Sequence, residues 1–461
     1  MAFEKQIQSC LKLTITFPFS KSVTCLTYYY LSMNVLILGS GGREHAMAWK
    51  ILQSSLLTNL YVTPGNAGTA GIATNMDVAV NDFKAIKKLV IEKKITLVVV
   101  GPEGPLVDGI TDFFTKDKDL KNVGIIGPDA SAARLEGSKD FAKQFMVKYH
   151  IPTAKYASFT KSTLKEGQQF LTTMKPPFVL KADGLASGKG VLIIDNLKEA
   201  QNALGTLLDG QFGEASRKVV IEEFLKGVEM SVFIITDGDS YKVLPTAKDY
   251  KRIGEGDTGL NTGGMGAVSP VPFVTPEYLD KIEAQIIIPT MKGLRAEGIK
   301  YRGFIFFGLI KVGNEPFVIE YNCRMGDPET EVVIPRIKSD FLHLLEGAAT
   351  GSLSEQHIEI DHRAVATVML VAKGYPENPD KGKEIKGLDL IKGSIAFHAG
   401  TKLSKDKIIS NGGRVIAVTS FGGDIEEALE RSYKSAELIQ YSGKNYRKDI
   451  GFDLKKLLAK A

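Results

Sequence analysis

Short apolar runs alternate with helical patterns from Met33 onward, and the runs end in glycine-rich loops. The first run, Val35–Leu38, is fully apolar, as is typical of a buried parallel strand, and a helical pattern follows through Leu52. Further strands are predicted at Leu60–Thr63, Leu97–Val100 and Gly124–Ile126, and a helix near Asp82–Lys93. This repeated order of strand, loop and helix predicts a doubly wound parallel sheet, with ligand-binding loops at the carboxyl ends of its strands.

The loop after the first run reads Gly39-Ser40-Gly41-Gly42-Arg43-Glu44-His45. Its glycines would let the backbone approach an anion at the N-terminus of the following helix. A nicotinamide dinucleotide fingerprint would need a third glycine where Glu44 stands, and an acidic residue after the second strand, where Pro64-Gly65-Asn66 is found. Phosphate binding is the interpretation we favour, a purely structural turn is the second, and a nicotinamide site is disfavoured.

A second candidate loop follows the strand predicted at Phe178–Lys181 and leads into another strand. A small, glycine-rich loop with Lys181 at its start and Lys189 near its end can fold over a triphosphate as a flap. It is not a P-loop, because Asp183 stands where the first glycine is needed and Gly190 replaces the magnesium-binding Ser or Thr. An ordinary glycine hairpin is the alternative, and it leaves the two lysines unexplained.

The stretch Val219–Glu229 is predicted to be a strand that leads into a linker. The backbone of such a linker could bond the edge of an adenine ring, and Glu229 could reach ribose hydroxyls. A solvated acidic strand end explains the same residues equally well.

A later strand, Pro316–Ile319, runs into Glu320-Tyr321-Asn322-Cys323-Arg324. Residues two apart on a strand share one face, so Glu320 and Asn322 can present two oxygens to one hard cation. Magnesium takes such ligands together with nucleotide phosphates. By itself the pattern is common and usually structural, and it gains weight from the lysine-bearing loop upstream.

Composition narrows the class of protein. The 461 residues, 44% of them apolar and 24% charged, are enough for about three globular domains. The net charge of +5 and the lack of long like-charge blocks argue against nucleic acid as a partner, and no apolar run is long enough to cross a membrane. The cysteines Cys10, Cys25 and Cys323 form neither a disulfide framework nor a metal pattern.

The first 32 residues differ from the rest of the chain. They lack the apolar core of a signal peptide and contain no arginine, which a transit peptide would have. Because Val35–Leu38 already supplies the first strand, we expect translation to start at Met33. We expect residues 1–32 to be a non-native or disordered extension that carries no functional residue.

Several longer motifs connect these loops, and they lie at Gly39–His45, Pro64–Gly68, Gly101–Glu103, Lys181–Val191, Asp249–Arg252, Gly256–Gly259, Asn261–Gly266 and Asn322–Glu329. Together they resemble the ATP-grasp superfamily and, within it, the glycinamide ribonucleotide synthetase family. The resemblance extends from Met33 to the end of the chain. Departures occur at Lys248, Tyr321 and Cys323, and the strand Phe304–Ile310 lacks the second metal-binding acid of many ATP-grasp ligases. Water or an acid such as Glu329 would then complete the metal site.

The resemblance implies an α/β fold with three parts. It implies an N-terminal doubly wound parallel-sheet domain, a central ATP-grasp domain with a flap subdomain, and a small mixed α/β C-terminal domain. The expected ranges are 33–135, 136–350 with the flap at about 155–225, and 356–461. The implied reaction of purine biosynthesis is the ATP-dependent ligation of glycine to 5-phosphoribosylamine through a glycyl phosphate.

The resemblance also assigns residues to roles. It implies ATP contacts by Lys139, Lys181, Lys189, Glu222, Glu223, Leu225 and Glu229. It implies substrate contacts by Gly41, Gly42, Arg43, Asn66, Asp249, Lys251 and Arg324. Lys181 and Arg324 are the expected catalytic residues, and Glu320 and Asn322 the expected ligands of Mg²⁺ or Mn²⁺. We expect a cytoplasmic monomer whose partners are small molecules only.

Alternatives remain for single residues and for the whole chain. Arg324 could instead form a structural ion pair with Asp327, and Arg43 could pair with Glu44 or another acid. A nicotinamide-dependent oxidoreductase, an inactive binding module and a purine-pathway carboxylase that uses bicarbonate are the competing functions. Testing glycine against bicarbonate as the trigger of ATP cleavage separates the ligase from the carboxylase.

Overall fold

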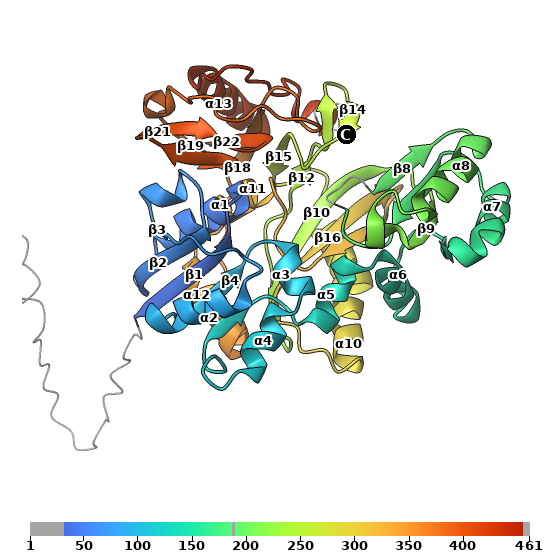
Figure 1. Cartoon of the computed structure of the whole chain (residues 1–461), viewed down its shortest axis with the longest axis horizontal. Coiled ribbons are helices and arrows are strands. Elements are labelled where there is room, and N and C mark those ends of the chain that lie inside the picture. The colour runs from blue at the N-terminus through green and yellow to red at the C-terminus, as the bar shows by residue number, and fades with distance from the viewer. Residues whose placement is uncertain (1–31, 187–189, 455–461) are drawn as a thin grey trace, which may run out of the picture. The chain divides into compact units, whose positions relative to one another are not determined.

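The computed structural model describes residues 32–186 and 190–454 (Figure 1). The expectations for residues 1–31 and for Lys189 lie outside the described residues. Within them, no helix is both long and apolar enough to cross a membrane.

The N-terminal part is a parallel sheet in the order β3-β2-β1-β4-β5, which confirms the predicted architecture. Its strands are β1 (Met33–Gly39), β2 (Leu57–Pro64), β3 (Thr74–Asn75), β4 (Leu97–Val100) and β5 (Gly124–Ile126). Helices α1 (Gly42–Ile51) and α2 (Phe83–Glu92) follow β1 and β3. Strand β1 lies between β2 and β4, so the loops that leave β1 and β4 diverge and open the crevice where such sheets bind ligands.

Two antiparallel sheets follow, and the chain passes from one to the other through residues 224–227. The first, β6-β9-β7-β8, consists of β6 (Tyr156–Thr160), β7 (Phe178–Ala182), β8 (Val191–Ile194) and β9 (Lys218–Glu223). The second, β11-β10-β16-β17, consists of β10 (Val228–Thr236), β11 (Tyr241–Val243), β16 (Gly303–Val312) and β17 (Glu315–Asn322). The predicted lysine-bearing strand and its antiparallel partner are therefore β7 and β8, with Lys181 opposite Val191.

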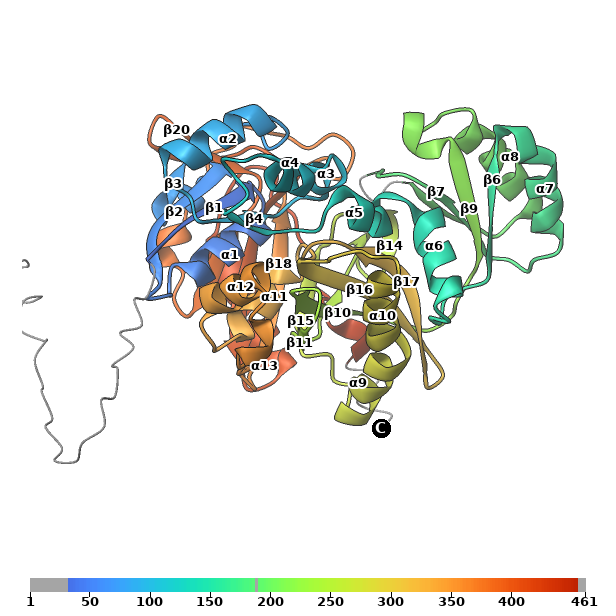
Figure 2. The same cartoon turned by 90° about the horizontal axis from the view of Figure 1, so that it is seen from below.

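Helices cover one face of each antiparallel sheet because their apolar stripes share its core. Helices α7 (Leu164–Thr172) and α8 (Leu197–Leu208) bury Leu171 and Leu204 against the first sheet. Helices α6 (Lys139–Lys148), α9 (Pro276–Ile282) and α10 (Ile288–Ala296) pack on the second sheet (Figure 2). Phe307, a core residue of that sheet, belongs to the same hydrophobic cluster as Leu36 of β1. A continuous core thus ties the second antiparallel sheet to the parallel sheet.

A five-stranded sheet, β12-β15-β18-β22-β19, joins distant parts of the chain. It contains β12 (Lys248–Asp249), β15 (Gly266–Ser269), β18 (Ala364–Val371), β19 (Ser394–His398) and β22 (Arg414–Gly422), and α13 (Ile425–Leu438) packs on β18 and β22. Two hairpins accompany it, β13 (Arg252–Gly254) with β14 (Thr258–Asn261) and β20 (Thr401–Ser404) with β21 (Lys407–Ser410). The remaining helices are α3 (Glu103–Val107), α4 (Ile110–Lys116), α5 (Ala130–Gly137), α11 (Thr330–Val333) and α12 (Phe341–Thr350). Because β15 pairs with β18, the expected central and C-terminal parts share one sheet, and their boundary stays a prediction.

Candidate functional site

Lys181 and Lys143 meet the same carboxylate. Lys181 Nζ on β7 lies 3.0 Å from Glu222 Oε1 on β9, and Lys143 Nζ on α6 lies 3.0 Å from Glu222 Oε2. All three side chains are buried. Burial favours the neutral acid, but the two ammonium groups outweigh it and hold the pKa of Glu222 below its ordinary value. Burial also lowers the pKa of Lys143 to about 8. The Glu222 side chain therefore fixes Lys181, while its backbone is paired within the sheet between β6 and β7.

Lys139 opens α6 beside the loop that follows β7. The Ser138 hydroxyl, which caps this helix, donates to Asp183 Oδ1 at 3.0 Å, and Lys139 Nζ donates to the Gly184 carbonyl at 3.1 Å. Burial lowers the pKa of Lys139, and the negative charge of Glu320 opposes that shift. Lys139 is therefore within electrostatic reach of a predicted metal ligand on the other antiparallel sheet.

The linker between β9 and β10 carries three predicted ATP contacts in different settings. Glu223 Oε1 accepts a 3.0 Å hydrogen bond from the Lys155 amide, so this side chain holds the start of β6. Leu225 is half-buried and Glu229 is exposed. Glu229 Oε2 lies 3.3 Å from Lys251 Nζ, and the Lys251 charge lowers the pKa of Glu229. The sequence did not indicate this ion pair.

Glu320 and Asn322 lie on one face of β17, opposite Gly308 and Phe306 of β16. The Glu320 side chain is 39% exposed, and Lys251 Nζ is 4.0 Å away. In the described part of the chain, no cluster of three or more His, Cys, Asp or Glu side chains could hold a metal. The Glu320 carboxylate and the Asn322 amide fit a magnesium ion, because magnesium usually takes few protein ligands and completes its shell with water and phosphate oxygens.

Acidic side chains surround Lys251. The charges of Asp249 and then Glu229 raise the pKa of Lys251 well above its ordinary value. Burial raises the pKa of Asp249, and burial together with the Asp249 charge raises the pKa of Glu329 to about 7. Glu329 Oε1 accepts a 3.2 Å hydrogen bond from Ser231 Oγ. The structure thus brings the substrate candidates Asp249 and Lys251 together with the end of β17, and a metal-binding role for Glu329 stays a prediction.

Arg324 connects β17 to the N-terminal part of the chain. Its Nη2 lies 2.6 Å from Glu136 Oε1 on α5, and its Nε lies 3.3 Å from Glu103 Oε2 on α3. Glu136 also accepts the Cys323 amide at 2.8 Å. Burial lowers the pKa of Arg324, but Glu136 and Glu103 outweigh it and raise the pKa. Within the described residues, Arg324 Nε lies in an ion pair with Glu103 without hydrogen-bond geometry, so this donor can turn to a ligand oxygen.

The alternative pairing of Arg324 with Asp327 is wrong. Asp327 Oδ1 lies 2.9 Å from Arg414 Nη1, which comes from β22. Asp327 Oδ2 lies 3.9 Å from Arg43 Nη2. The Asp327 carboxylate therefore links the N-terminal loop to the sheet that contains β22.

Glu44 fills the crevice between the loops that leave β1 and β4. Its side chain is buried, and Glu44 Oε2 accepts a 2.6 Å hydrogen bond from the Gly41 amide. Arg43 Nε lies 3.4 Å from Glu44 Oε1, and Arg43 Nη1 donates to the Gly101 carbonyl at 2.6 Å. The alternative partner of Arg43 is thus present in the structure. Because Glu44 occupies the space that a pyrophosphate would need, the loop is unsuited to a dinucleotide.

Asn66 and Gly42 are held by structural contacts. Asn66 Nδ2 donates to the Ser40 carbonyl at 2.9 Å and to the His398 carbonyl at 2.7 Å, which joins the loop after β1 to β19. A Cβ at Gly42 would lie 2.2 Å from Glu331 Oε1, so this close approach requires glycine. Backbone amides at the start of α1 are then the phosphate-binding groups that this loop can offer.

Sequence reasoning missed residues whose partners are distant in the chain. These are Lys143, Glu103, Glu136, Arg414 and Glu331. Only Glu103 had a signal, because it lies in a quoted glycine-proline motif. Together the described side chains place the cations Lys139, Lys181 and Lys251 and the metal-ligand candidates Glu320 and Asn322 where strands β7 and β17 end. This arrangement suits binding of a polyphosphate next to a carboxylate.

Three family models match almost the whole described chain. They are the phosphoribosylglycinamide synthetase N domain over residues 33–136, the ATP-grasp (A) domain over 137–330, and the C domain over 365–453. The chain is 46% identical over 426 residues to the phosphoribosylamine–glycine ligase of Haemophilus influenzae, covering 91% of this chain and 98% of the relative. It is also 46% identical over 428 residues to the Salmonella typhimurium enzyme of that name, with the same two coverages.

Solved structures show the same likeness. The phosphoribosylamine–glycine ligase of Thermotoga maritima superposes with a TM-score of 0.78 at 36% identity, covering 90% of this chain and 99% of that one. A biotin carboxylase domain of Hydrogenobacter thermophilus, solved with MgADP and bicarbonate, superposes with a TM-score of 0.65 at 17% identity over 90% of this chain and 91% of its own. At that identity it shows the fold alone, and the fold is the predicted one.

Proposed function

This chain belongs to the phosphoribosylglycinamide synthetase family, and we propose that it works through a glycyl phosphate formed where β7 and β17 end. It ligates glycine to 5-phosphoribosylamine in purine biosynthesis and converts ATP to ADP. The observation that carries the proposed route is that cations lie near Glu320 at the end of β17, with Lys251 Nζ 4.0 Å from Glu320 Oε1 and Lys139 within electrostatic range of that carboxylate. This arrangement puts phosphate-binding cations near a predicted metal ligand.

The route follows from the chemistry of the substrates. A carboxylate is a poor electrophile, because an oxide ion is a poor leaving group. Transfer of the γ-phosphoryl group to a glycine carboxylate oxygen forms an acyl phosphate and releases ADP. The amine of 5-phosphoribosylamine then attacks the acyl carbon, the C–O bond breaks with its electron pair on phosphate, and the nitrogen loses a proton. The protein supplies positioning and charge neutralisation.

Lys139 and Lys181 would bind phosphate oxygens, and the linker after β9 would face the adenine with the Leu225 backbone, while Glu222 would act on the nucleotide by holding Lys181. Lys181 suits this task because Glu222 already holds its ammonium group in one place. Glu229 would turn from Lys251 to the ribose hydroxyls when nucleotide binds, and Glu223 would support the linker through Lys155.

Glu320 and Asn322 would hold the divalent cation, for which we propose Mg²⁺. When bound, the cation neutralises phosphate charge and aligns the transferred group. The Glu320 side chain is partly exposed and its ion pair with Lys251 is long, at 4.0 Å, so ligation costs few protein contacts.

The substrate side lies beyond the end of β17. Arg324 Nε would turn from its ion pair with Glu103 to the glycine carboxylate or the transferred phosphoryl group, with Glu136 keeping the guanidinium in place. Asp249 and Lys251 would line the pocket for glycine or the amine. The loop Gly41–Arg43 would receive the 5-phosphate, with the Gly42 amide as its backbone donor because Glu44 holds the Gly41 amide, and with Arg43 and Asn66 behind it.

An isotope experiment tests the route. Glycine labelled with ¹⁸O in its carboxylate, supplied with ATP, Mg²⁺ and 5-phosphoribosylamine, should release phosphate that carries one ¹⁸O atom. Unlabelled phosphate would contradict a glycyl phosphate. ATP cleavage triggered by bicarbonate instead of glycine would favour the carboxylase alternative.

A pair of variants links this route to the site. Lys181→Met should lower kcat/KM for ATP about tenfold or more, because a charge-assisted hydrogen bond contributes roughly 1.5–3 kcal/mol. Lys198→Met removes an exposed lysine of α8 and should leave kcat/KM unchanged. Equal kinetics in the two variants would remove Lys181 from the site. We further propose a monomer located in the cytoplasm, with sedimentation and cell fractionation as the checks.

A further inference from the structure

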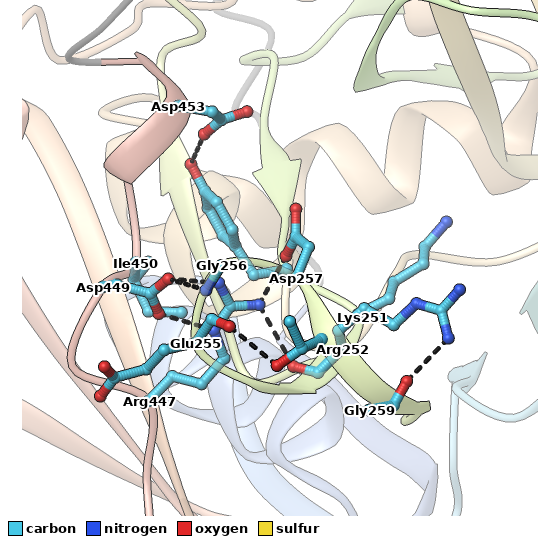
Figure 3. Close-up of polar contacts among 12 residues, drawn as sticks. Lys251, Arg252, Glu255, Gly256, Asp257, Gly259, Arg447, Asp449, Ile450 and Asp453 are labelled. Atoms are coloured by element: carbon cyan, nitrogen blue, oxygen red, sulfur yellow. Dashed lines mark hydrogen bonds and ion pairs between the residues drawn. The ribbon is translucent and has the colours of Figure 1, made fainter.

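Arg447 is a buried cation in the segment that follows α13. Its side chain is 1% exposed and lies beside the rings of Tyr250 and Phe452, at 5.5 and 5.7 Å from their centroids. Arg447 Nε and Nη2 donate to the two oxygens of Asp449, each at 2.8 Å (Figure 3). The guanidinium is therefore held by its own segment through Nε and Nη2, which leaves Nη1 for contacts with other parts of the chain.

Arg447 Nη1 reaches the hairpin β13–β14. It donates to Asp257 Oδ1 at 2.6 Å in the hairpin turn and to the Arg252 carbonyl at 3.2 Å in β13 (Figure 3). Asp449 Oδ2 accepts the Gly256 amide of the same turn at 2.7 Å. The turn itself is bent through left-handed backbone, with φ of 66° at Gly256 and 56° at Asp257. A two-stranded hairpin is marginal by itself, so these contacts hold it in place.

Both neighbours of Lys251 are fixed by the same C-terminal segment. Tyr250, before it, donates its hydroxyl to Asp453 Oδ1 at 2.8 Å and contacts the Arg447 guanidinium. The carbonyl of Arg252, the residue after Lys251, accepts a hydrogen bond from Arg447. Lys251 itself points away from this cluster (Figure 3), with Nζ 3.3 Å from Glu229.

We propose that Arg447 is a positioning residue that fixes the hairpin β13–β14 and thereby holds Lys251 at Glu229 and Glu320. This inference rests on the proposed function, which places Lys251 beside the reacting groups. It gives the C-terminal segment a part in substrate binding through a hairpin of the central part. Arg447 touches no proposed substrate atom, and it acts through the backbone on both sides of Lys251.

Hydrogen exchange tests the structural half of this proposal. Arg447→Lys keeps the charge but cannot reach Asp257, Asp449 and the Arg252 carbonyl together. In the full-length protein, we expect deuterium uptake of the peptide 250–262 to rise at least tenfold in rate. Arg336→Lys is the matched control, because Arg336 is also buried and bonds the carbonyls of Asp361 and Arg363. Parental uptake in the peptide 250–262 of Arg447→Lys would overturn the proposal.

A double-mutant cycle tests the functional half. Arg447→Lys and Lys251→Met should each lower kcat/KM for glycine, by tenfold or more. If Arg447 acts through Lys251, the double variant is no worse than Lys251→Met. Losses that multiply would overturn the proposal, since they would show that Arg447 acts independently. Arg336→Lys should lower the thermal midpoint without such coupling to Lys251.

The two proposals fail in different ways. If Lys251→Met retains the parental kcat/KM, the positioning role of Arg447 is overturned, while ¹⁸O transfer in the parent protein still supports the glycyl phosphate. If the parent protein transfers no ¹⁸O, the proposed route fails, while exchange in the hairpin still reports whether Arg447 holds it.

Discussion

Gly101 lies directly against the Glu44 carboxylate, and a Cβ at Gly101 would be only 2.1 Å from Glu44 Oε1. The Glu44 side chain is buried and bonded to the Gly41 amide, so it has little room to move aside. Two loops that diverge at the carboxyl ends of β1 and β4 are therefore joined by a carboxylate that only a glycine can accommodate.

Gly101→Ala should destabilise the protein by about 1–3 kcal/mol, the usual cost of overpacking a closely packed site. Gly104→Ala is the control, because a Cβ there meets nothing within 4 Å and alanine is the better helix former in α3. Urea unfolding followed by circular dichroism measures both free energies. Equal stability of the two variants would show that Glu44 can move away.

Glu222→Gln should be strongly destabilising and should raise KM for ATP. The substitution leaves the ammonium groups of Lys181 and Lys143 buried without their shared carboxylate, and breaking a buried ion pair costs about 3–5 kcal/mol. Glu166→Gln changes an exposed acid of α7 and should have a much smaller effect. Thermal unfolding and ATP titration compare the two, and matching results would argue against the shared pair.

Glu320→Gln should shift the magnesium dependence of activity to higher concentration, because it keeps the shape of the side chain and removes the anionic oxygen. Binding of MgADP, followed by calorimetry, should weaken in parallel. Glu315→Gln lies at the start of the same strand, where Glu315 pairs with Lys281 on the surface, and it should behave as the parent. Overlapping magnesium titrations of the two variants would show that Glu320 is no ligand.

Glu331→Gln should stabilise the protein increasingly as pH rises. Burial and the charge of Asp327 raise the pKa of Glu331 well above its ordinary value, and within the described residues neither carboxylate oxygen has a hydrogen-bond partner. Above the ordinary pKa, the unfolded chain has lost a proton that the folded protein keeps, so Glu331 lowers the free energy of unfolding as pH rises. Glutamine does not titrate and removes this slope.

The measurement for Glu331 is urea unfolding at several pH values between 5 and 8. The difference between the variant and the parent should grow towards the higher pH. Glu355→Gln, which changes an exposed acid, is the control and should leave the difference flat. A difference that shrinks with rising pH would reverse the predicted direction of the Glu331 shift.

The sequence by itself determined the local parts of this protein. Strand β1, its glycine loop and α1 follow from an apolar run and a helical pattern, and the period of a strand puts Glu320 and Asn322 on one face. The exclusions were also local, since Glu44 and Gly190 each stand where a nucleotide motif needs another residue. Such features depend on neighbours in the chain, so periodicity and spacing reveal them.

Only the tertiary structure decided which charges meet. Ion pairs form between Lys181 and Glu222, between Arg324 and Glu136, and between Arg447 and Asp257, each across a long stretch of sequence. A buried charge needs a partner of opposite sign, but the sequence offers many acids for each cation. The strand order and the path of the loops select among them, which is why the pairing of Arg324 with the nearby Asp327 was the wrong alternative.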